Sequence, residues 1–109
     1  MLYLMSTTVV PHNADGIWRM QTIGADYAVD LVTGGEWISA VGHESSAAAM
    51  SAILGVPIAM NRITVTPEPG DSFLCLRLHS RPPEGVILDT AQMESIGFSW
   101  ALMTYLNLC

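Results

Sequence analysis

The sequence predicts an α/β (α+β) fold in a single domain, residues 1–109, with a mixed β-sheet of about five to six strands flanked by short helices. Two observations predict it. Short apolar segments with strand-like alternation are interleaved with short segments of helical character. A tight turn between two neighbouring alternating segments adds an antiparallel pair, so both strand directions are expected in one sheet. A chain of 109 residues is long enough for one modest core.

The first half of the chain is expected to contain three strands, over residues 2–5, 17–23 and 36–41. Residues 25–32 predict a short helix that ends at two glycines.

The alanine-rich stretch 46–54 gives the clearest helix signal. Its start is marked by Ser45 or Ser46 as a cap, with Glu44 favourable in the first turn, and its end by Gly55. His43 is therefore expected beside a helix N-terminus.

In the second half, residues 62–66 and 73–81 are expected to form a hairpin across the turn at 67–71. Residues 89–94 predict a short helix begun by Asp89, and residues 98–106 predict a final strand. Within 73–81, alternation places leucines on one face and three polar residues on the other, namely Arg77, His79 and Arg81.

The composition is apolar and acidic. Hydrophobic residues make up 50% of the chain and charged residues 13%, which leaves little polar surface for a monomer and favours a homodimer. The net charge of −6 disfavours non-specific binding to long DNA or RNA. All four basic residues are arginines, the type best suited to bidentate contact with phosphate, so any anion site must use them.

The two cysteines, Cys75 and Cys109, form neither a disulfide framework nor a metal-binding spacing, which is typical of a cytoplasmic protein. The histidines are scattered, without nearby cysteines or carboxylates in a ligand pattern, so neither a metal nor another cofactor is expected. The N-terminal residues lack a signal-peptide pattern, and the most apolar segment, 47–60, is interrupted by polar and helix-breaking residues. No membrane association is expected.

A histidine at a helix start together with arginines at strand ends can form an anion site. Backbone N–H groups at a helix N-terminus attract phosphate, and Arg62 and Arg81 can each place two donors on its oxygens. A purely structural interpretation stays open, in which His43 caps a turn and the arginines pair with Glu84 or Asp71.

Four motifs at these positions resemble a known family, the viral anti-CRISPR ring nucleases of type III systems. They are AVGHESS at 40–46, NR at 61–62, GD at 70–71 and RPPEG at 81–85, in the order and with the separations of the family. The opening TTVVP at 7–11 resembles bacterial members. The sequence departs from the family at Ser6, usually asparagine, at Ser46, usually threonine, and at Pro82, usually leucine.

The resemblance implies a homodimer that holds cyclic tetra-adenylate across its two-fold axis. It implies metal-independent cleavage to linear di-adenylate with 2′,3′-cyclic phosphate ends, which silences type III CRISPR signalling in a host or bacterial cytoplasm. His43 is expected as general acid, Arg62 and Arg81 as stabilisers of charge on phosphate, and Glu84 as an orienting group. The implied ligand-binding residues are Ser6, Thr7, Gly42, Ser45, Ser46 and Asn61.

Two other functions stay open. One is a non-catalytic dimer that binds and sequesters the cyclic nucleotide, and the other is a structural or regulatory dimer that binds no nucleotide. Because a general acid must carry its proton, the enzyme is expected to work best at mildly acidic to neutral pH.

Overall fold

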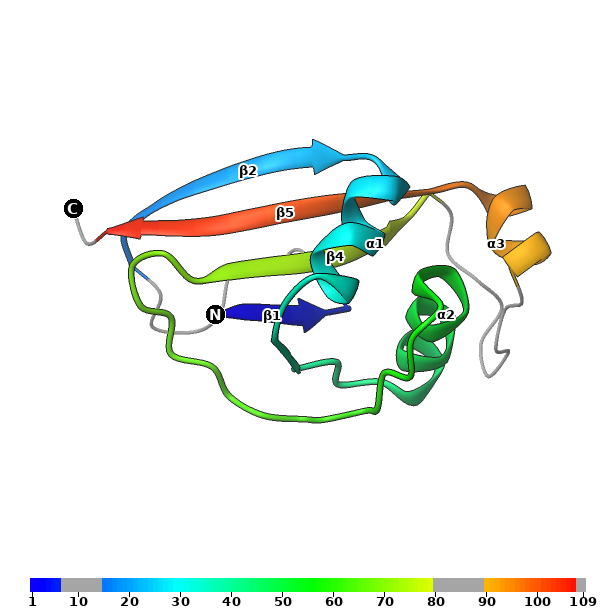
Figure 1. The fold of residues 1–109 in the computed structure, drawn as a ribbon, viewed down its shortest axis with the longest axis horizontal. Helices are drawn as coiled ribbons and strands as arrows, with labels where there is room; N and C mark the ends of the chain where they lie inside the picture. The colour runs from blue at the N-terminus through cyan, green and yellow to red at the C-terminus, as the bar shows by residue number, and fades with distance from the viewer. Residues whose placement is uncertain (7–14, 80–89, 108–109) are drawn as a thin grey trace.

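The protein folds around a five-stranded mixed sheet with three helices (Figure 1). The computed structural model describes residues 1–6, 15–79 and 90–107. The strands are β1 (Leu2–Met5), β2 (Ile17–Ile23), β3 (Trp37–Ser39), β4 (Ser72–Leu78) and β5 (Phe98–Asn107), and the helices are α1 (Ala25–Thr33), α2 (Glu44–Leu54) and α3 (Thr90–Ile96). The mixed sheet and the short helices confirm the predicted fold class.

The strand order in the sheet is β2-β5-β4-β1-β3. The strand β1 pairs in parallel with β3 on one side and with β4 on the other, while β5 pairs antiparallel with β4 and with β2. The three parallel strands therefore end at the same edge of the sheet. The chain leaves that edge at Ser6 after β1, at Ala40 after β3 and at His79 after β4.

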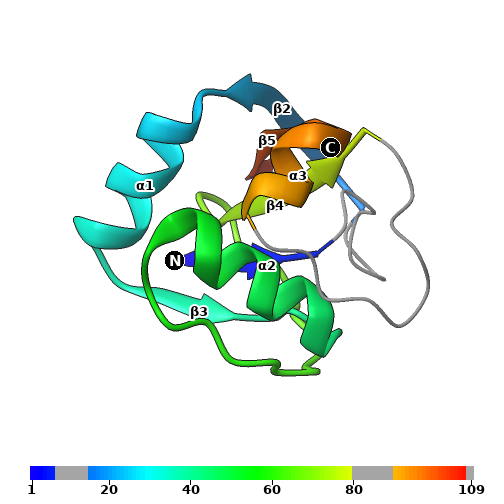
Figure 2. The same ribbon diagram turned by 90° about the vertical axis from the view of Figure 1, so that its right-hand side faces the viewer.

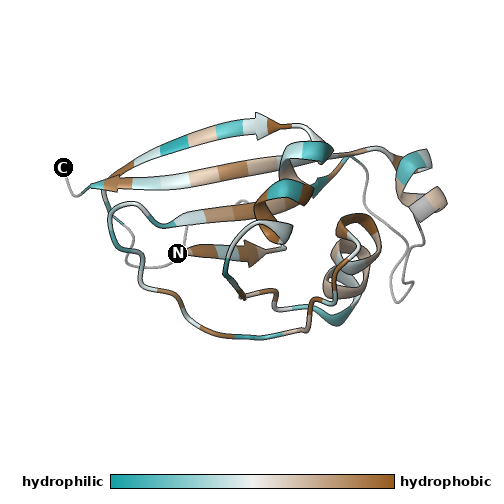
Figure 3. Cartoon of the chain, viewed as in Figure 1, coloured by the Kyte–Doolittle hydropathy of each residue, from teal (hydrophilic) through white to brown (hydrophobic). Residues whose placement is uncertain are grey.

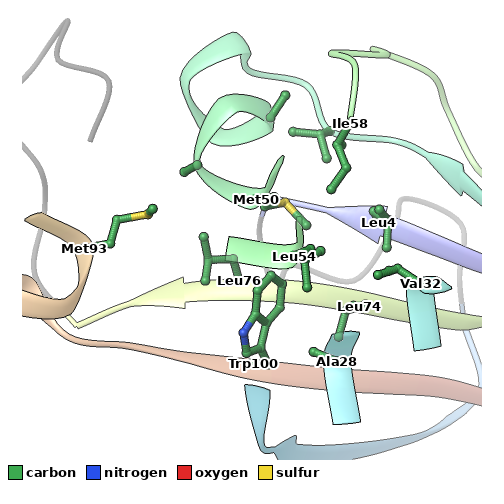
Figure 4. Close-up of a cluster of buried hydrophobic side chains, with 13 residues drawn as sticks. Leu4, Ala28, Val32, Met50, Leu54, Ile58, Leu74, Leu76, Met93 and Trp100 are labelled. Atoms are coloured by element: carbon green, nitrogen blue, oxygen red, sulfur yellow. The ribbon is translucent and has the colours of Figure 1, made fainter. Parts of the chain in front are cut away.

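One face of the sheet packs against the helices. In Figure 1 the helix α1 crosses in front of β4 and β5, whereas α2 and α3 lie towards the edge where β1 ends, and Figure 2 views the molecule from that edge. Figure 4 shows the resulting core, in which Met50 and Leu54 of α2 lie close to Leu76 and Trp100 of the sheet. Of these, Met50 is fully buried and Trp100 nearly so, and this apolar burial is the main force that holds α2 in place.

The opposite face of the sheet carries an aromatic cluster. The ring of Trp18 stacks on Tyr105 at 5.0 Å between centroids, and Tyr3 stacks on Phe73 at 5.2 Å. Among the described residues this core is formed by strand residues together with Ala40 and Val65, and no helix contributes to it. Cys75 lies within it, and burial raises the pKa of this thiol to about 12, against a smaller opposite effect of the nearby Arg77.

Both faces of β4 are thus apolar, and Figure 3 shows hydrophobic colours concentrated in the central strands, with hydrophilic positions on the edge strand β2. The face of β4 that was expected to be polar is only partly so. It carries Arg77, but Phe73 and Cys75 are buried on the same face. None of the described helices is long and apolar enough to cross a bilayer.

The predicted hairpin is wrong. Residues 57–68 form no strand, and β4 pairs instead with β1 and β5. The physical reason is that β4 has a partner on each side, so no free edge remains for residues 62–66. The overlapping stretch 58–62 is held by hydrogen bonds to Ser39, Val41, Gly42 and Ser51, which are described below.

Candidate anion site at the start of helix α2

The candidate site lies at the carboxyl edge of the parallel strands β1 and β3. In open sheets with parallel strands, ligands commonly bind outside the carboxyl ends of the strands. Here β3 ends at Ser39, and the chain crosses this edge through residues 40–43 into α2. The N–H of Ala40 still donates to the Leu4 carbonyl of β1 at 2.8 Å, so the crossing segment begins from a fixed point of the sheet.

His43 is the N-cap residue of α2, one residue before the helix starts at Glu44. Its backbone is extended (φ −132°, ψ 133°), and its carbonyl accepts the first helical hydrogen bond, from the Ala47 N–H at 3.0 Å. The position beside a helix N-terminus confirms the sequence prediction. The predicted caps Ser45 and Ser46 are wrong, because the helix begins earlier and both residues lie in its first turn.

Three backbone N–H groups at the start of α2 lack helical acceptors, those of Glu44, Ser45 and Ser46. Within the described ranges no side chain caps the helix, and His43 itself is exposed. Such uncapped donors together with the helix dipole favour an anion at this end. The carboxylate of Glu44 opposes that preference, since it sits in the same first turn.

Arg62 lies beside this helix start, although it is 19 residues from His43 in sequence. Its Nη2 and Nε atoms both donate to the carbonyl oxygen of Gly42, at 2.9 and 3.2 Å. Two of the five guanidinium donors are used in this way, and the other three bond to no residue that the structure describes. The side chain is exposed, so a phosphate can reach it from solvent.

Asn61 is held against β3 by two hydrogen bonds. Its backbone N–H donates to the Val41 carbonyl at 2.8 Å, and its side-chain Nδ2 donates to the Ser39 carbonyl at 2.7 Å. The Ser39 hydroxyl donates to the Ala59 carbonyl at 2.6 Å. Sequence reasoning missed Ser39, and its only signal was that it is a polar residue inside the expected strand 36–41.

The other predicted site residues divide into two groups. Ser6 follows β1 at the same edge and Gly42 precedes His43, so the structure brings both to this region. The predicted Thr7, Arg81 and Glu84 lie outside the described residues. The last described residues before them are Ser6, which follows β1, and His79, which follows β4.

The structural alternative for the arginines fails in one respect. Asp71 does not pair with Arg62; its carboxylate accepts hydrogen bonds from the Met1 amino group at 3.2 Å and from the Glu68 N–H at 2.9 Å. Arg77 donates to the Thr22 hydroxyl at 2.7 Å, on the aromatic face. Of the described arginines, Arg62 is therefore the one at the start of α2.

The described part of the chain contains no group of three or more His, Cys, Asp or Glu side chains placed to hold a metal ion. A separate hollow of about 400 Å³ lies between α1 and the strands β2 and β5, and its lining includes Arg19 and Tyr27. It contains none of the predicted site residues. The chemistry of the described site therefore rests on one imidazole, one guanidinium and the N–H groups of α2.

The fold is that of a small α+β protein with a candidate anion site at a helix start, and a family profile identifies the class. The chain belongs to the STIV B116-like family, whose profile matches residues 2–100. The family relationship that the sequence motifs indicated is thereby confirmed.

Particular relatives are viral and bacterial. The chain is 34% identical over 101 residues to protein ORF117 of Acidianus two-tailed virus, covering 89% of this chain and 86% of that protein. It is 31% identical over 102 residues to protein 26 of Sulfolobus islandicus filamentous virus, covering 91% and 86%. It is 32% identical over 73 residues to YddF of Bacillus subtilis, covering 67% and 68%.

A solved structure has the same fold. B116 of Sulfolobus turreted icosahedral virus superposes with a TM-score of 0.74 over 95% of this chain and 98% of that chain, at 18% sequence identity. At this identity the likeness establishes the fold alone. The names of these relatives state no activity.

Proposed function

We propose that the protein is a metal-independent ring nuclease that cleaves cyclic tetra-adenylate to linear di-adenylate with 2′,3′-cyclic phosphate ends and so antagonises type III CRISPR signalling. The observation that carries the proposal is the meeting of His43, Arg62 and the uncapped start of α2 at one edge of the sheet. Cleavage of a phosphodiester is helped by a proton donor, a cation and oriented hydrogen-bond donors. His43 can supply the first, Arg62 the second and the N–H groups of α2 the third.

The chemistry requires little of the protein because the substrate carries its own nucleophile. The 2′-hydroxyl oxygen attacks the adjacent phosphorus, and a bond from phosphorus to that oxygen forms as the bond to the 5′-oxygen breaks. The hydroxyl proton passes to solvent, and His43 donates a proton to the departing 5′-oxygen. The products are a 2′,3′-cyclic phosphate and a free 5′-hydroxyl.

Arg62 is suited to stabilise the charge that develops on the non-bridging oxygens. Its three remaining donors lie next to His43, since its other two hold the carbonyl of Gly42. The N–H groups of α2 add a fixed positive potential at the same place. Arg81 and Glu84, which follow β4, are proposed to complete the site as the second cation and the group that orients His43.

A homodimer is part of the proposal. A two-fold dimer places two copies of the site around one ring, and the symmetry of such a dimer suits a ring of four equal linkages. The apolar composition, 50% of residues, supports self-association. Cleavage at two opposite linkages then yields two di-adenylates from each ring.

The test is incubation of the purified protein with cyclic tetra-adenylate in excess chelator, with wild type beside His43→Ala and products separated by chromatography. The expected result is linear di-adenylate from wild type, and a loss of turnover with retained binding in His43→Ala. Absence of both cleavage and binding by wild type would refute the proposal and favour a structural or regulatory dimer.

A second candidate is a non-catalytic dimer that sequesters the same ligand. The observation that favours it concerns His43, whose side chain has no hydrogen-bond partner among the described residues and is exposed. Binding needs the arginine and the helix start but no oriented imidazole. Tight binding without cleavage by wild type, unchanged in His43→Ala, would establish this candidate instead.

A further inference from the structure

The start of α2 and Arg62 are held together by the segment 58–62, which runs beside residues 39–42. Five hydrogen bonds cross between these two stretches. Ser39 Oγ donates to the Ala59 carbonyl at 2.6 Å, and the two donors of Asn61 bond to the carbonyls of Val41 and Ser39 at 2.8 and 2.7 Å. Arg62 Nη2 adds the bond to Gly42 at 2.9 Å, strengthened by Nε at 3.2 Å.

The far end of the segment 58–62 is fixed to the body of α2. The Ser51 hydroxyl accepts the Ile58 N–H at 2.9 Å and donates to the Ala47 carbonyl at 2.7 Å. The side chain of Ile58 is buried in the core beside Leu4, as Figure 4 shows. The segment is therefore anchored to α2 at one end, and its contact with β3 decides where Arg62 lies at the other.

Ser39 has a central place in this arrangement. It is 9% exposed, it is the last residue of β3, and it pairs with Leu4 of β1. Besides the bond to Ala59, its hydroxyl oxygen lies 3.4 Å from the Val41 N–H as an acceptor. One hydroxyl group thus contacts both stretches, the one that leads to His43 and the one that leads to Arg62.

We infer that Ser39 is a positioning residue of the site, which fixes Arg62 and His43 relative to each other without touching the ligand. This inference rests on the proposed function, because it assigns Ser39 a role in the same reaction. Ser39 lies four residues before His43 in a buried position, so its hydroxyl acts through the bonds to Ala59 and Val41.

The physical reason is the sensitivity of phosphoryl chemistry to alignment. A displacement of about 1 Å at the reacting groups can cost on the order of 100-fold in rate. Without the Ser39 hydroxyl, the Ala59 carbonyl loses its donor and the Val41 N–H loses its acceptor, so residues 40–43 and 58–62 can shift relative to each other. The imidazole and the guanidinium remain chemically intact.

The experiment compares Ser39→Ala with wild type in cleavage of cyclic tetra-adenylate. We expect kcat to fall by about 10- to 100-fold while KM changes by less than about 5-fold, because alignment is lost and the binding groups remain. The pH dependence of the rate should keep its shape, since the proton donor is unchanged. Ser39→Thr restores the hydroxyl and should recover most of kcat.

The matched control is Ser72→Ala. Ser72 is the first residue of β4, partly buried and remote from residues 39–43. Its hydroxyl forms a hydrogen bond with that of Thr104 at 3.3 Å. This variant tests whether loss of any serine hydroxyl in the sheet lowers activity. We expect its kcat to stay within about 2-fold of wild type, because the Ser72–Thr104 bond lies outside the candidate site.

A readout without substrate is the hydrogen exchange of the Asn61 backbone amide, which donates to Val41. It should exchange at least about 10-fold faster in Ser39→Ala, as expected when a local hydrogen-bonded unit opens more easily. If Ser39→Ala does not fold, Ser39→Cys keeps the volume and a weaker donor, and it should show an intermediate loss of kcat.

The outcomes separate the two proposals. If wild type fails to cleave the ring, the proposed function fails, whatever Ser39→Ala does. If wild type cleaves the ring, the result for the Ser39 variants decides the inference. Wild-type kcat in Ser39→Ala, or in Ser39→Cys where Ser39→Ala does not fold, overturns it. An equal loss in Ser72→Ala would overturn it too, because the effect would then be general destabilisation of the sheet.

Discussion

Replacement of Arg62 tests whether this side chain serves the reaction or merely holds the fold. Arg62→Ala removes two hydrogen bonds to the Gly42 carbonyl, both at an exposed position. Because both bonds share one acceptor and solvent can replace them, their joint net contribution is about 1 kcal/mol. For a domain of this size the melting temperature should fall by only about 4 °C.

The effect on the reaction should be much larger. If Arg62 stabilises charge on the phosphate, its loss should lower kcat by about 100- to 1,000-fold, or roughly 3 to 4 kcal/mol of transition-state stabilisation. Arg62→Lys keeps a positive charge, but its ammonium group lacks the planar set of donors that lets a guanidinium bond to the Gly42 carbonyl and a phosphate together. It should therefore recover activity only in part.

The assay is cleavage of cyclic tetra-adenylate at fixed low salt, with thermal unfolding measured on the same samples. Arg19→Ala is the matched control, because it removes the same charge from an exposed position on β2, on the lining of the separate hollow. Activity of Arg62→Ala within about 3-fold of wild type would refute the assigned role. A fall in melting temperature above about 10 °C would instead show that the two bonds to Gly42 mainly stabilise the fold.

Three further predictions address the helix start, the buried thiol and the turn before β5. Glu44→Gln removes the carboxylate from the first turn of α2, and it should tighten binding of cyclic tetra-adenylate by about 2- to 5-fold at low salt in isothermal titration, with the gain lost at high salt. Burial raises the pKa of Cys75 to about 12, so in a Cys109→Ser background this thiol should resist alkylation at pH 8.5 until denaturant is added. In the unfolded chain the thiol ionises near pH 9, so below that pH its contribution to the unfolding free energy is complete. From pH 9 towards 12 the unfolding free energy measured by urea titration should fall by about 1.4 kcal/mol per pH unit. Equal stability at pH 8 and 10.5 would contradict this. Gly97 has φ +88°, and a Cβ there would lie 2.8 Å from Nδ1 of His79, so Gly97→Ala should lower the unfolding free energy by about 1 to 3 kcal/mol. Gly42→Ala, where a Cβ would meet its nearest atom at 3.9 Å, should melt close to wild type.

The site could be predicted from sequence only where local signals were sufficient. His43 was placed beside a helix start because Glu44, the alanines that follow and the stop at Gly55 all favour one helix, and Gly55 has the left-handed conformation (φ 73°) typical of that stop. The assignment of roles came from resemblance to a family, and the comparisons confirm the family relationship. The roles themselves stay proposals.

The elements were predicted well where periodicity is local. The strands β1 and β2 have the predicted bounds, and α1 and β5 extend only one residue beyond theirs. In each case the pattern of apolar residues lies within the element, and glycines stand next to β2, α1 and the start of β5. The expected strand at 36–41 shortens to Trp37–Ser39. Beyond Ser39 the chain turns away from the sheet towards α2.

Only the tertiary structure decided the partners of each segment. Residues 62–66 alternate as a strand does, but β4, the strand expected to pair with them, already has β1 on one side and β5 on the other. The same long-range arrangement brings Arg62 to Gly42 and Ser39 to Ala59, which are 20 residues apart in each case. Sequence by itself determined the local conformations and the composition of the site, because these depend on near neighbours. The sheet order and the hydrogen bonds that join the two halves of the site depend on packing across the whole chain.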